Sequence, residues 1–309
     1  MKVGIVRMGT VGRSSAIAIA LRTQVQELVL VNRNRAVAKG VATDMRYGLP
    51  PWSRIRVADG DYPGLAGAQL VVLTAGVNEK TGGATDRNDP LGRLRLLAPN
   101  AQVYEEVVPR IAAAAPEAPI LVVTDPPEPL TDVARRLAGH ERVFGAGTMI
   151  DSLRLRVHIA ARLGVSAASV HAYVVGEHGT SSVFLWSSAR IGGARLGEIL
   201  AQRRLAFDDF RRAVEQDVRY ANIAIIEGIG ASQYGIGMVV ARMVEAVLGD
   251  EHAVFAVGSY QGRYGATLSL PSVLARDGVS EVLAPEMSAD EARALERSAE
   301  KLRGALAEL

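Results

Sequence analysis

The first half of the chain alternates short apolar runs with amphipathic stretches. Four runs are rich in valine, isoleucine and leucine and are apolar on both faces, at residues 3–6, 27–31, 69–74 and 120–124. Runs of this kind are typical of strands that are buried on both sides in a parallel sheet. Helical spacing follows the first run at 14–22 and precedes the fourth at 101–115. This alternation predicts an α/β fold built on a doubly wound parallel sheet.

The pattern changes after Asp151. Long helices are expected at 207–228 and 289–306, and β-like segments at 169–175 and 266–273. Because strands and helices no longer alternate regularly, the second half is predicted to be a mixed α+β domain. We place the boundary near residues 146–150, which divides the chain into domains at 1–147 and 148–309.

Composition narrows the classes of protein. The 309 residues are 49% apolar and 22% charged, which excludes a disordered or fibrous chain. None is cysteine, which excludes a disulfide scaffold, thiol catalysis, an iron–sulfur cluster and a cysteine-ligated zinc site, and no metal is expected. The 35 basic and 33 acidic residues give a formal net charge of +2, so neither nucleic acid nor membrane is expected as a partner.

The sequence carries no recognisable targeting segment. The N-terminus lacks the long apolar run and the cleavage site of a secretory signal, and no stretch reaches the roughly 18–20 apolar residues that a membrane span requires. The expected location is therefore the cytoplasm.

A glycine loop after the first predicted strand carries part of a phosphate-binding fingerprint. In Gly-x-Gly-x-x-Gly, the glycines let the backbone turn tightly and approach a pyrophosphate at the start of a helix. Residues 7–12 read Arg-Met-Gly-Thr-Val-Gly, so that Arg7 replaces the first glycine and either distorts the loop or meets the phosphate itself. A dinucleotide is predicted to bind in a Rossmann-type domain at Gly9, Thr10, Val11 and Gly12. The alternative is an ordinary strand-to-helix turn without a ligand.

The end of the second predicted strand bears on the choice of cofactor. An acidic residue usually binds the ribose hydroxyls there, but residues 31–35 read Val-Asn-Arg-Asn-Arg. Asn32 still hydrogen-bonds a hydroxyl and carries no charge that would repel a 2′-phosphate, while Arg33 and Arg35 would attract one. The expected cofactor is NAD or NADP, with NADP favoured by Asn32 and Arg33. The alternative is that both arginines are solvated surface residues.

Several longer motifs resemble one enzyme family. The sequence reads Gly-Thr-Met-Ile-Asp-Ser-Leu-Arg at 147–154 and Val-Gly-Glu-His-Gly-Thr-Ser at 175–181, with Ala-Gly-Val-Asn at 75–78, Trp-Ser-Ser-Ala at 186–189 and Tyr-Gly-Ile-Gly at 234–237. Together these segments resemble the NAD-dependent L-lactate and malate dehydrogenases, nearer the L-lactate branch, with this chain as a divergent member. The resemblance covers essentially the whole chain in order, and it implies that 148–309 is the substrate and catalytic domain.

The residue roles that the resemblance implies agree with what the reduction of a 2-oxo acid requires. Reducing a 2-oxo acid needs a proton donor at the carbonyl oxygen and a cation for the carboxylate. His178 matches the family's proton donor, and its ordinary pKa near physiological pH suits that role. Asp151 matches the acid that orients the imidazole, and Arg154, one helical turn later, matches the arginine that binds the carboxylate through two hydrogen bonds. The cofactor side of the cleft is expected to include Ala75, Gly76 and Asp125.

The segment at 79–93 matches the family's mobile loop over the substrate and is longer than usual. Helical phase at 94–100 places the family's carbonyl-polarising arginine at Arg93, with Arg87 as the alternative if the extra residues follow it. The glycines of this loop permit hinge motion, as a lid requires. The alternative is a disordered surface insertion.

Departures from the family pattern bear on specificity. Glu79 stands where lactate enzymes carry glutamine and malate enzymes carry arginine, so its carboxylate is expected to repel oxaloacetate unless the insertion moves it out of the pocket. Asp125 replaces an asparagine near the nicotinamide and cannot donate the amide's hydrogen bond unless it is protonated. Ser232 replaces a threonine, and Thr180 replaces the acid after His-Gly. We interpret these changes as altered specificity rather than loss of activity.

The predicted function is therefore that of an oxidoreductase. It would transfer a hydride between a nicotinamide cofactor and a small-molecule 2-oxo or 2-hydroxy acid, and the resemblance implies a homodimer or homotetramer. The alternatives are malate dehydrogenase-like activity and a catalytically silent nucleotide-binding homologue. The NAD-dependent glycosidases share the dinucleotide fold but generally use a cysteine among their metal ligands, which this chain lacks.

Overall fold

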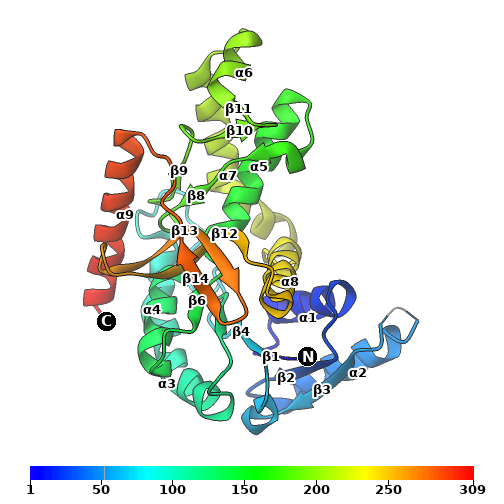
Figure 1. Cartoon of the computed structure of the whole chain (residues 1–309). Coiled ribbons are helices and arrows are strands. Elements are labelled where there is room, and N and C mark those ends of the chain that lie inside the picture. The colour runs from blue at the N-terminus through cyan, green and yellow to red at the C-terminus, as the bar shows by residue number, and fades with distance from the viewer. Residues whose placement is uncertain (52) are drawn as a thin grey trace.

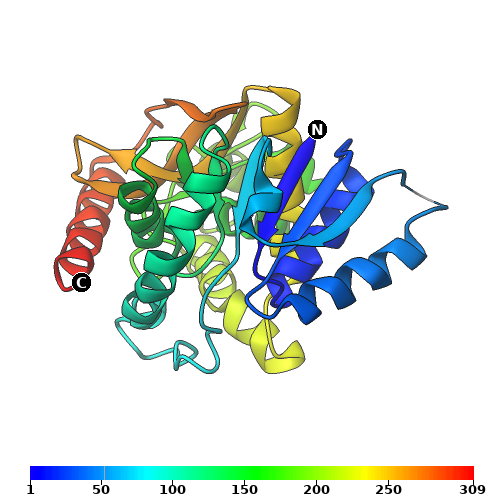
Figure 2. The same ribbon diagram turned by 90° about the horizontal axis from the view of Figure 1, so that it is seen from below.

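The computed structural model describes residues 1–51 and 53–309 (Figures 1 and 2). Within these residues, nine strands form the main sheet in the order β14-β13-β12-β6-β5-β4-β1-β2-β3. Six neighbouring strands run parallel, namely β1 (Lys2–Val6), β2 (Glu27–Val31), β3 (Arg56–Gly60), β4 (Leu70–Leu73), β5 (Ile120–Val122) and β6 (Val143–Gly145). The chain builds outward from β1 first to one side and then to the other, which confirms the predicted α/β fold with a doubly wound sheet.

Helices cover both faces of the parallel strands. One face packs against α1 (Thr10–Arg22), α2 (Arg35–Gly48) and α8 (Tyr234–Gly249), and the other against α3 (Leu97–Ala114) and α4 (Pro127–Ala138). Ile5 and Val6, neighbours in β1, belong to opposite cores because successive strand residues point to opposite faces. Two-sided burial is therefore the reason that these strands are apolar throughout.

The helix α8 comes from the second half of the chain but lies beside α1 (Figure 1). Gly237 permits this close approach, since a Cβ at that position would lie 2.8 Å from the backbone of Ser14. The Ser14 hydroxyl also donates a hydrogen bond to the Gln233 carbonyl at 2.8 Å. The second half is thus anchored on the start of the first.

The second half extends the main sheet by three strands and also forms two small sheets of its own. Strand β12 pairs antiparallel with β6 at Gly258 and Gly145, and two more antiparallel strands follow it. These strands are β12 (Ala253–Gln261), β13 (Ala266–Ala275) and β14 (Gly278–Val282). Two small sheets join β7 (Val170–His171) with β10 (Arg190–Ile191) and β11 (Ala194–Arg195), and β8 (Val174–Val175) with β9 (Val183–Phe184).

The remaining helices belong to the second half. They are α5 (Met149–Leu163), α6 (Leu196–Gln202), α7 (Phe207–Ile229) and α9 (Ala289–Ala307). Among the described residues, no single helix has both the length and the apolar composition to span a membrane. Helices α7 and α8 reach the required length and apolar composition only when they are taken together, and the chain bends by 118° between them.

The predicted elements overlap elements of the structure, with differences in their bounds and with several strands missed. The segment at 169–175 is interrupted, because β7 and β8 pair with different sheets. The helix expected at 101–115 begins earlier, at Leu97, and the one expected at 14–22 begins at Thr10. Seven strands were not predicted, namely β3, β6, β9, β10, β11, β12 and β14. Strand β6 is only three residues long, β9, β10 and β11 have two residues each, and β14 has one buried residue among five.

Candidate active site

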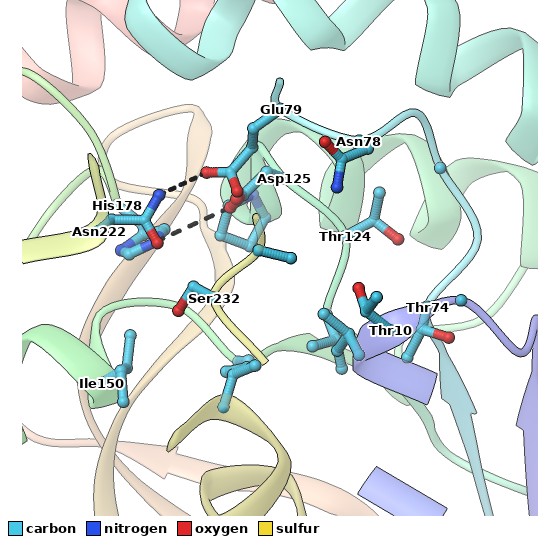
Figure 3. A pocket seen from close by; sticks show the side chains of 18 of the residues that line it. Thr10, Thr74, Asn78, Glu79, Thr124, Asp125, Ile150, His178, Asn222 and Ser232 are labelled. Carbon is cyan, nitrogen blue, oxygen red and sulfur yellow. Dashed lines mark hydrogen bonds and ion pairs between the residues drawn. The ribbon is translucent and has the colours of Figure 1, made fainter. Parts of the chain in front are cut away.

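A cleft of about 360 Å³ lies at the carboxyl ends of β1, β4 and β5 (Figure 3). Parallel strands all end at this edge of the sheet, so the loops that follow them converge there. The second half closes the cleft with side chains from α5, from the loop that carries His178, from α7 and from the loop before α8. The cleft is lined by Gly9, Thr10, Val11, Gly76, Glu79, Asp125, Arg154, His178, Asn222 and Ser232, among others.

The glycine loop after β1 keeps its turn without the first glycine. Arg7 takes a left-handed conformation with φ of 81°, which costs a non-glycine residue about 1–2 kcal/mol. Its N–H donates to the Val31 carbonyl at 2.7 Å, and its carbonyl accepts the Thr74 hydroxyl at 2.8 Å. Gly12 is required behind the loop, because a Cβ there would lie 2.2 Å from the Arg7 carbonyl oxygen. The tight turn after β1 therefore forms although Arg7 replaces the first glycine, and Arg7 contributes to it through its backbone.

The mouth of this loop suits a phosphate. A Cβ on Gly9 would meet no atom within 4 Å, which leaves open space in front of the backbone. Helix α1 begins at Thr10 without a side-chain cap, so its first N–H groups are available to an anion. The residues present therefore fit a pyrophosphate group.

Asn32 and Arg33 lie beside this loop but do not line the cleft described above. The Asn32 side chain accepts the Met8 N–H at 3.0 Å and donates to the Asn34 carbonyl at 2.9 Å, so it supports the loop. Arg33 is exposed, whereas Arg35 forms ion pairs with two aspartates at 3.1 and 3.3 Å.

The three predicted catalytic residues of the second half come together. Asp151 and Arg154 project from the first turns of α5, three residues apart and on one face. Asp151 Oδ2 hydrogen-bonds Nδ1 of His178, and Asp151 Oδ1 accepts from Arg154 Nη1 at 3.0 Å. His178 is only 7% exposed and lies two residues after Gly176, whose φ of +84° favours glycine. One carboxylate thus holds both the imidazole and the guanidinium.

These contacts alter the pKa values of the pair. Burial and the positive charge of Arg93 lower the pKa of His178, but the charge and hydrogen bond of Asp151, together with the charge of Asp125, outweigh them and raise that pKa above its ordinary value. Burial would likewise raise the pKa of Asp151, and the charge and hydrogen bond of His178 lower it to about 2. Asp151 is therefore ionised at neutral pH and favours the protonated, proton-donating form of His178.

The structure brings Arg93, and not Arg87, to the site. Arg93 lines a small adjoining cavity together with Asp151, Arg154 and His178. Its Nε lies 3.3 Å from carboxylate oxygens of both Glu79 and Asp125, and these charges raise its pKa although burial opposes them. Arg87 instead pairs through both of its Nη atoms, at 2.8 Å, with Glu227 on α7.

Glu79 lies inside the cleft, so the longer loop does not carry it away (Figure 3). Asn222 on α7 donates to Glu79 Oε1 at 2.7 Å. Asp125 lies between these groups and His178, with 3.8 Å from its Oδ1 to the imidazole Nε2. Burial, reinforced by the charge of Asp125 and opposed by Arg93, raises the pKa of Glu79 to about 7.

Other predicted residues divide between lining the cleft and supporting it. Ser232 and Gly76 line it. Ala75 does not line the cleft, because it is fully buried behind the residues that do. Its carbonyl accepts the Thr124 hydroxyl at 2.8 Å. Thr180 lies at the lid, where its hydroxyl donates to the Pro90 carbonyl at 3.1 Å.

Two site residues were missed by the sequence analysis. Asn222 carries no motif, and its only signal is a polar residue on the buried face of α7. Asn100 is fully buried, where its side chain accepts the Val77 N–H and donates to the Asp125 carbonyl, both at 2.7 Å. It joins the loops after β4 and β5. Among residues 1–51 and 53–309, no cluster of three or more histidine, aspartate or glutamate side chains is arranged to hold a metal ion.

Comparison with known proteins agrees with this geometry. The chain matches the NAD binding domain of lactate/malate dehydrogenase over residues 1–145 and its alpha/beta C-terminal domain over 148–309. It is 44% identical to an L-lactate dehydrogenase of Thermus aquaticus over 318 residues, covering 100% of this chain and 99% of that protein. It is 43% identical to an L-lactate dehydrogenase of Deinococcus radiodurans over 305 residues, covering 98% of each.

The likeness extends to solved structures. A lactate dehydrogenase enzyme from a Medee basin deep-sea metagenome library has a TM-score of 0.91 and 33% identity, and the match covers 99% of this chain and 98% of that one. The resemblance inferred from the motifs is therefore confirmed. The chain belongs to the lactate/malate dehydrogenase family.

Proposed function

We propose that this protein is a nicotinamide-dependent dehydrogenase that interconverts a small 2-oxo acid and its L-2-hydroxy acid, with pyruvate and lactate as the preferred pair. The observation that carries the proposal is the buried Asp151–His178 pair with Arg154 on the same carboxylate, at the wall of a cleft that also contains a glycine loop with room for a pyrophosphate. The L-lactate dehydrogenases among its relatives support the same activity.

The nicotinamide cofactor would be held by the loop at Gly9, Thr10 and Val11, and when bound it supplies the hydride. His178 then gives its Nε2 proton to the carbonyl oxygen of the substrate, while Asp151 keeps Nδ1 hydrogen-bonded and stabilises the imidazolium before transfer. Arg154 binds the substrate carboxylate, since a planar guanidinium matches a carboxylate with two hydrogen bonds. Exclusion of water from this buried pocket strengthens each of these interactions.

Arg93 has a separate task at the carbonyl group. In the substrate-free protein its charge is shared between Glu79 and Asp125. A substrate that enters the adjoining cavity offers its carbonyl oxygen as a further acceptor, and the guanidinium polarises it and stabilises the charge that develops there. The lid residues near Arg93 would exclude solvent as they close.

Glu79 supports pyruvate over oxaloacetate as the substrate. Its carboxylate lies inside the cleft within reach of Arg93, and above about pH 7, where Glu79 is ionised, a second substrate carboxylate would meet like charge there. A malate dehydrogenase-like activity is the second candidate, and it would require Arg93 to be drawn away from Glu79 toward the distal carboxylate.

We also propose that NADP is accepted, with Asn32 and Arg33 as the supporting residues, because neither repels a 2′-phosphate and Arg33 is exposed. A cytoplasmic homodimer or homotetramer is part of the same proposal. It is supported by large apolar side chains exposed on α7 and α8, namely Ile225, Ile229, Tyr234 and Met238.

The test is a spectrophotometric screen of 2-oxo acids with NADH and with NADPH. Turnover of pyruvate is expected to exceed that of oxaloacetate. The His178→Asn variant is expected to lose about 10²–10⁴-fold in kcat while still binding the cofactor. Cofactor binding without turnover of any 2-oxo acid would instead identify a catalytically silent homologue and refute the proposal. Tighter binding of NADH than of NADPH would refute the NADP proposal and leave the dehydrogenase proposal standing.

A further inference from the structure

A buried carboxylate outside the set of catalytic residues touches the loop that carries His178. Glu128, in the first turn of α4, is 0% exposed. One of its oxygens accepts the backbone N–H of His178 at 3.0 Å, and the other accepts the hydroxyl of Ser269, on β13, at 2.6 Å. An ionisable group is seldom fully buried without a specific partner, so these two contacts call for an explanation.

Ser269 ties the same carboxylate to the other catalytic segment. Its hydroxyl oxygen accepts the N–H of Thr148, the N-cap residue immediately before α5, at 3.1 Å. Its backbone pairs in both directions with Gly176, at 2.8 and 3.0 Å, two residues before His178. The approach is close enough to require glycine at 147, where a Cβ would lie 2.1 Å from the serine oxygen.

The directions of these hydrogen bonds specify what residue 128 must be. The N–H groups of His178 and Thr148 can only donate. Because the Ser269 oxygen already accepts from Thr148, its own proton points to Glu128. Residue 128 therefore accepts two hydrogen bonds at once and donates none, which an ionised carboxylate does with both oxygens. An amide of the same shape has only one accepting oxygen.

We propose that Glu128 and Ser269 are positioning residues for the reaction: they hold the His178 loop and the start of α5 in the relative placement that lets Asp151 meet the imidazole. The inference rests on the proposed dehydrogenase function. Burial raises the pKa of Glu128 to about 7, while the positive charge of His178 and the hydrogen bonds to Ser269 and His178 oppose that rise. The contacts that orient the loop are thus the same contacts that favour the ionised form of the carboxylate.

The contact itself is tested without reference to activity. The chain has five histidines, so a protein labelled with ¹⁵N-histidine gives five backbone amide signals, and the loss of one in His178→Asn assigns residue 178. An amide proton donated to a carboxylate lies downfield. In Glu128→Gln the signal is expected to move upfield, because a neutral acceptor forms a weaker bond. An unmoved signal would overturn the assignment of this contact.

Kinetics then test the positioning role. In Glu128→Gln we expect kcat to fall by about 10- to 100-fold with KM for pyruvate nearly unchanged, because a misplaced imidazole affects the reacting geometry more than ground-state binding. Glu128→Asp keeps an acceptor-only carboxylate and is expected to retain more of kcat than the glutamine variant. A rise in KM alone, or a lower kcat in the aspartate variant than in the glutamine variant, would contradict the proposal.

Glu291→Gln is the matched control. The Glu291 carboxylate also accepts backbone N–H groups, from Trp186 at 2.8 Å and Ser187 at 3.0 Å, as well as a serine hydroxyl. It belongs to α9 and is not among the residues that line the cleft. We expect it to lower the melting temperature and leave kcat unchanged. An equal loss of kcat in both variants would mean that Glu128 acts only through stability.

Ser269→Ala provides the second, independent variant if the Glu128 variants do not fold. Like Glu128→Gln, it is expected to lower kcat. The double variant Glu128→Gln/Ser269→Ala is expected to lose less kcat than the product of the two single losses, since both substitutions break the same hydrogen-bond network. Fully multiplicative losses would overturn the shared role. A wild-type protein without turnover would refute the dehydrogenase function instead, while the amide signal would still test the contact.

Discussion

Glu79 provides a test of how the cleft affects stability. Its carboxylate is 14% exposed, lies 3.3 Å from Arg93 Nε and accepts a hydrogen bond from Asn222 at 2.7 Å. Burial and the nearby charge of Asp125 still outweigh Arg93, and they raise the pKa of Glu79 from an ordinary 4.5 to about 7. Glu79→Gln removes the charge and keeps an oxygen that accepts from Asn222.

The magnitude follows from the two pKa values. The unfolded chain ionises Glu79 near pH 4.5, whereas the folded protein holds the proton until about pH 7. Between these values the unfolded state binds fewer protons, so the free energy of unfolding falls as pH rises. The loss is complete above pH 7 and amounts to about 3 kcal/mol. Glu79→Gln is therefore expected to be about as stable as the wild type near pH 4.5 and more stable above pH 7.

The assay is thermal unfolding of both proteins, without cofactor, between pH 4.5 and 8. At about 2 °C per kcal/mol for a chain of this size, the melting temperature of the variant should exceed that of the wild type by about 6 °C at pH 8. Glu227→Gln is the control, because the ion pair with Arg87 lowers the pKa of the exposed Glu227 and no gain is expected there. A difference in melting temperature that does not change with pH would refute the reasoning.

Three further substitutions test the catalytic and cofactor sites. Asp151→Asn removes a charge that raises the pKa of His178. In the pH profile of kcat/KM for pyruvate reduction, the variant is therefore expected to lose activity at a lower pH than the wild type. An unchanged midpoint of this profile would contradict the expectation. Arg154→Lys loses the two-point contact with the substrate carboxylate and is expected to raise KM for pyruvate by about 10- to 100-fold in steady-state assays. Gly12→Ala places a Cβ 2.2 Å from a backbone oxygen and is expected to lower both the melting temperature and cofactor affinity, whereas Gly9→Ala, with no atom within 4 Å, is expected to weaken cofactor binding alone.

Local pattern predicted a large part of the molecule. Two-sided apolar runs identified β1, β2, β4 and β5, because burial on both faces of a parallel sheet is a property of each strand by itself. The spacing of Asp151 and Arg154 placed them on one helix face, as the structure has them. Strand β14 has one buried residue among five, so it gives no periodic signal, and the Val-Phe-Gly of β6 is too short an apolar run to stand out.

The choice between Arg93 and Arg87 depended on contacts far apart in the chain. Both arginines lie in one glycine-containing loop, and nothing in their local sequence separates them. Glu227, 140 residues away, pairs with Arg87 at the surface, while Asp125 and Glu79 hold Arg93 in the cleft. Arg7 is a similar case, since its left-handed turn is held by residues of two other strand ends.

The sequence by itself determined much of the strand-and-helix pattern, the family motifs and the candidate residues Asp151, Arg154 and His178, since each of these is expressed within a few neighbouring positions. Only the tertiary structure decided which loop arginine reaches the site, that Glu79 meets Asn222, and that Glu128 and Ser269 join the two catalytic segments. Glu128 lies 50 residues from His178 and 141 from Ser269. Such contacts arise when the sheet brings its strand ends together, and no local periodicity records them.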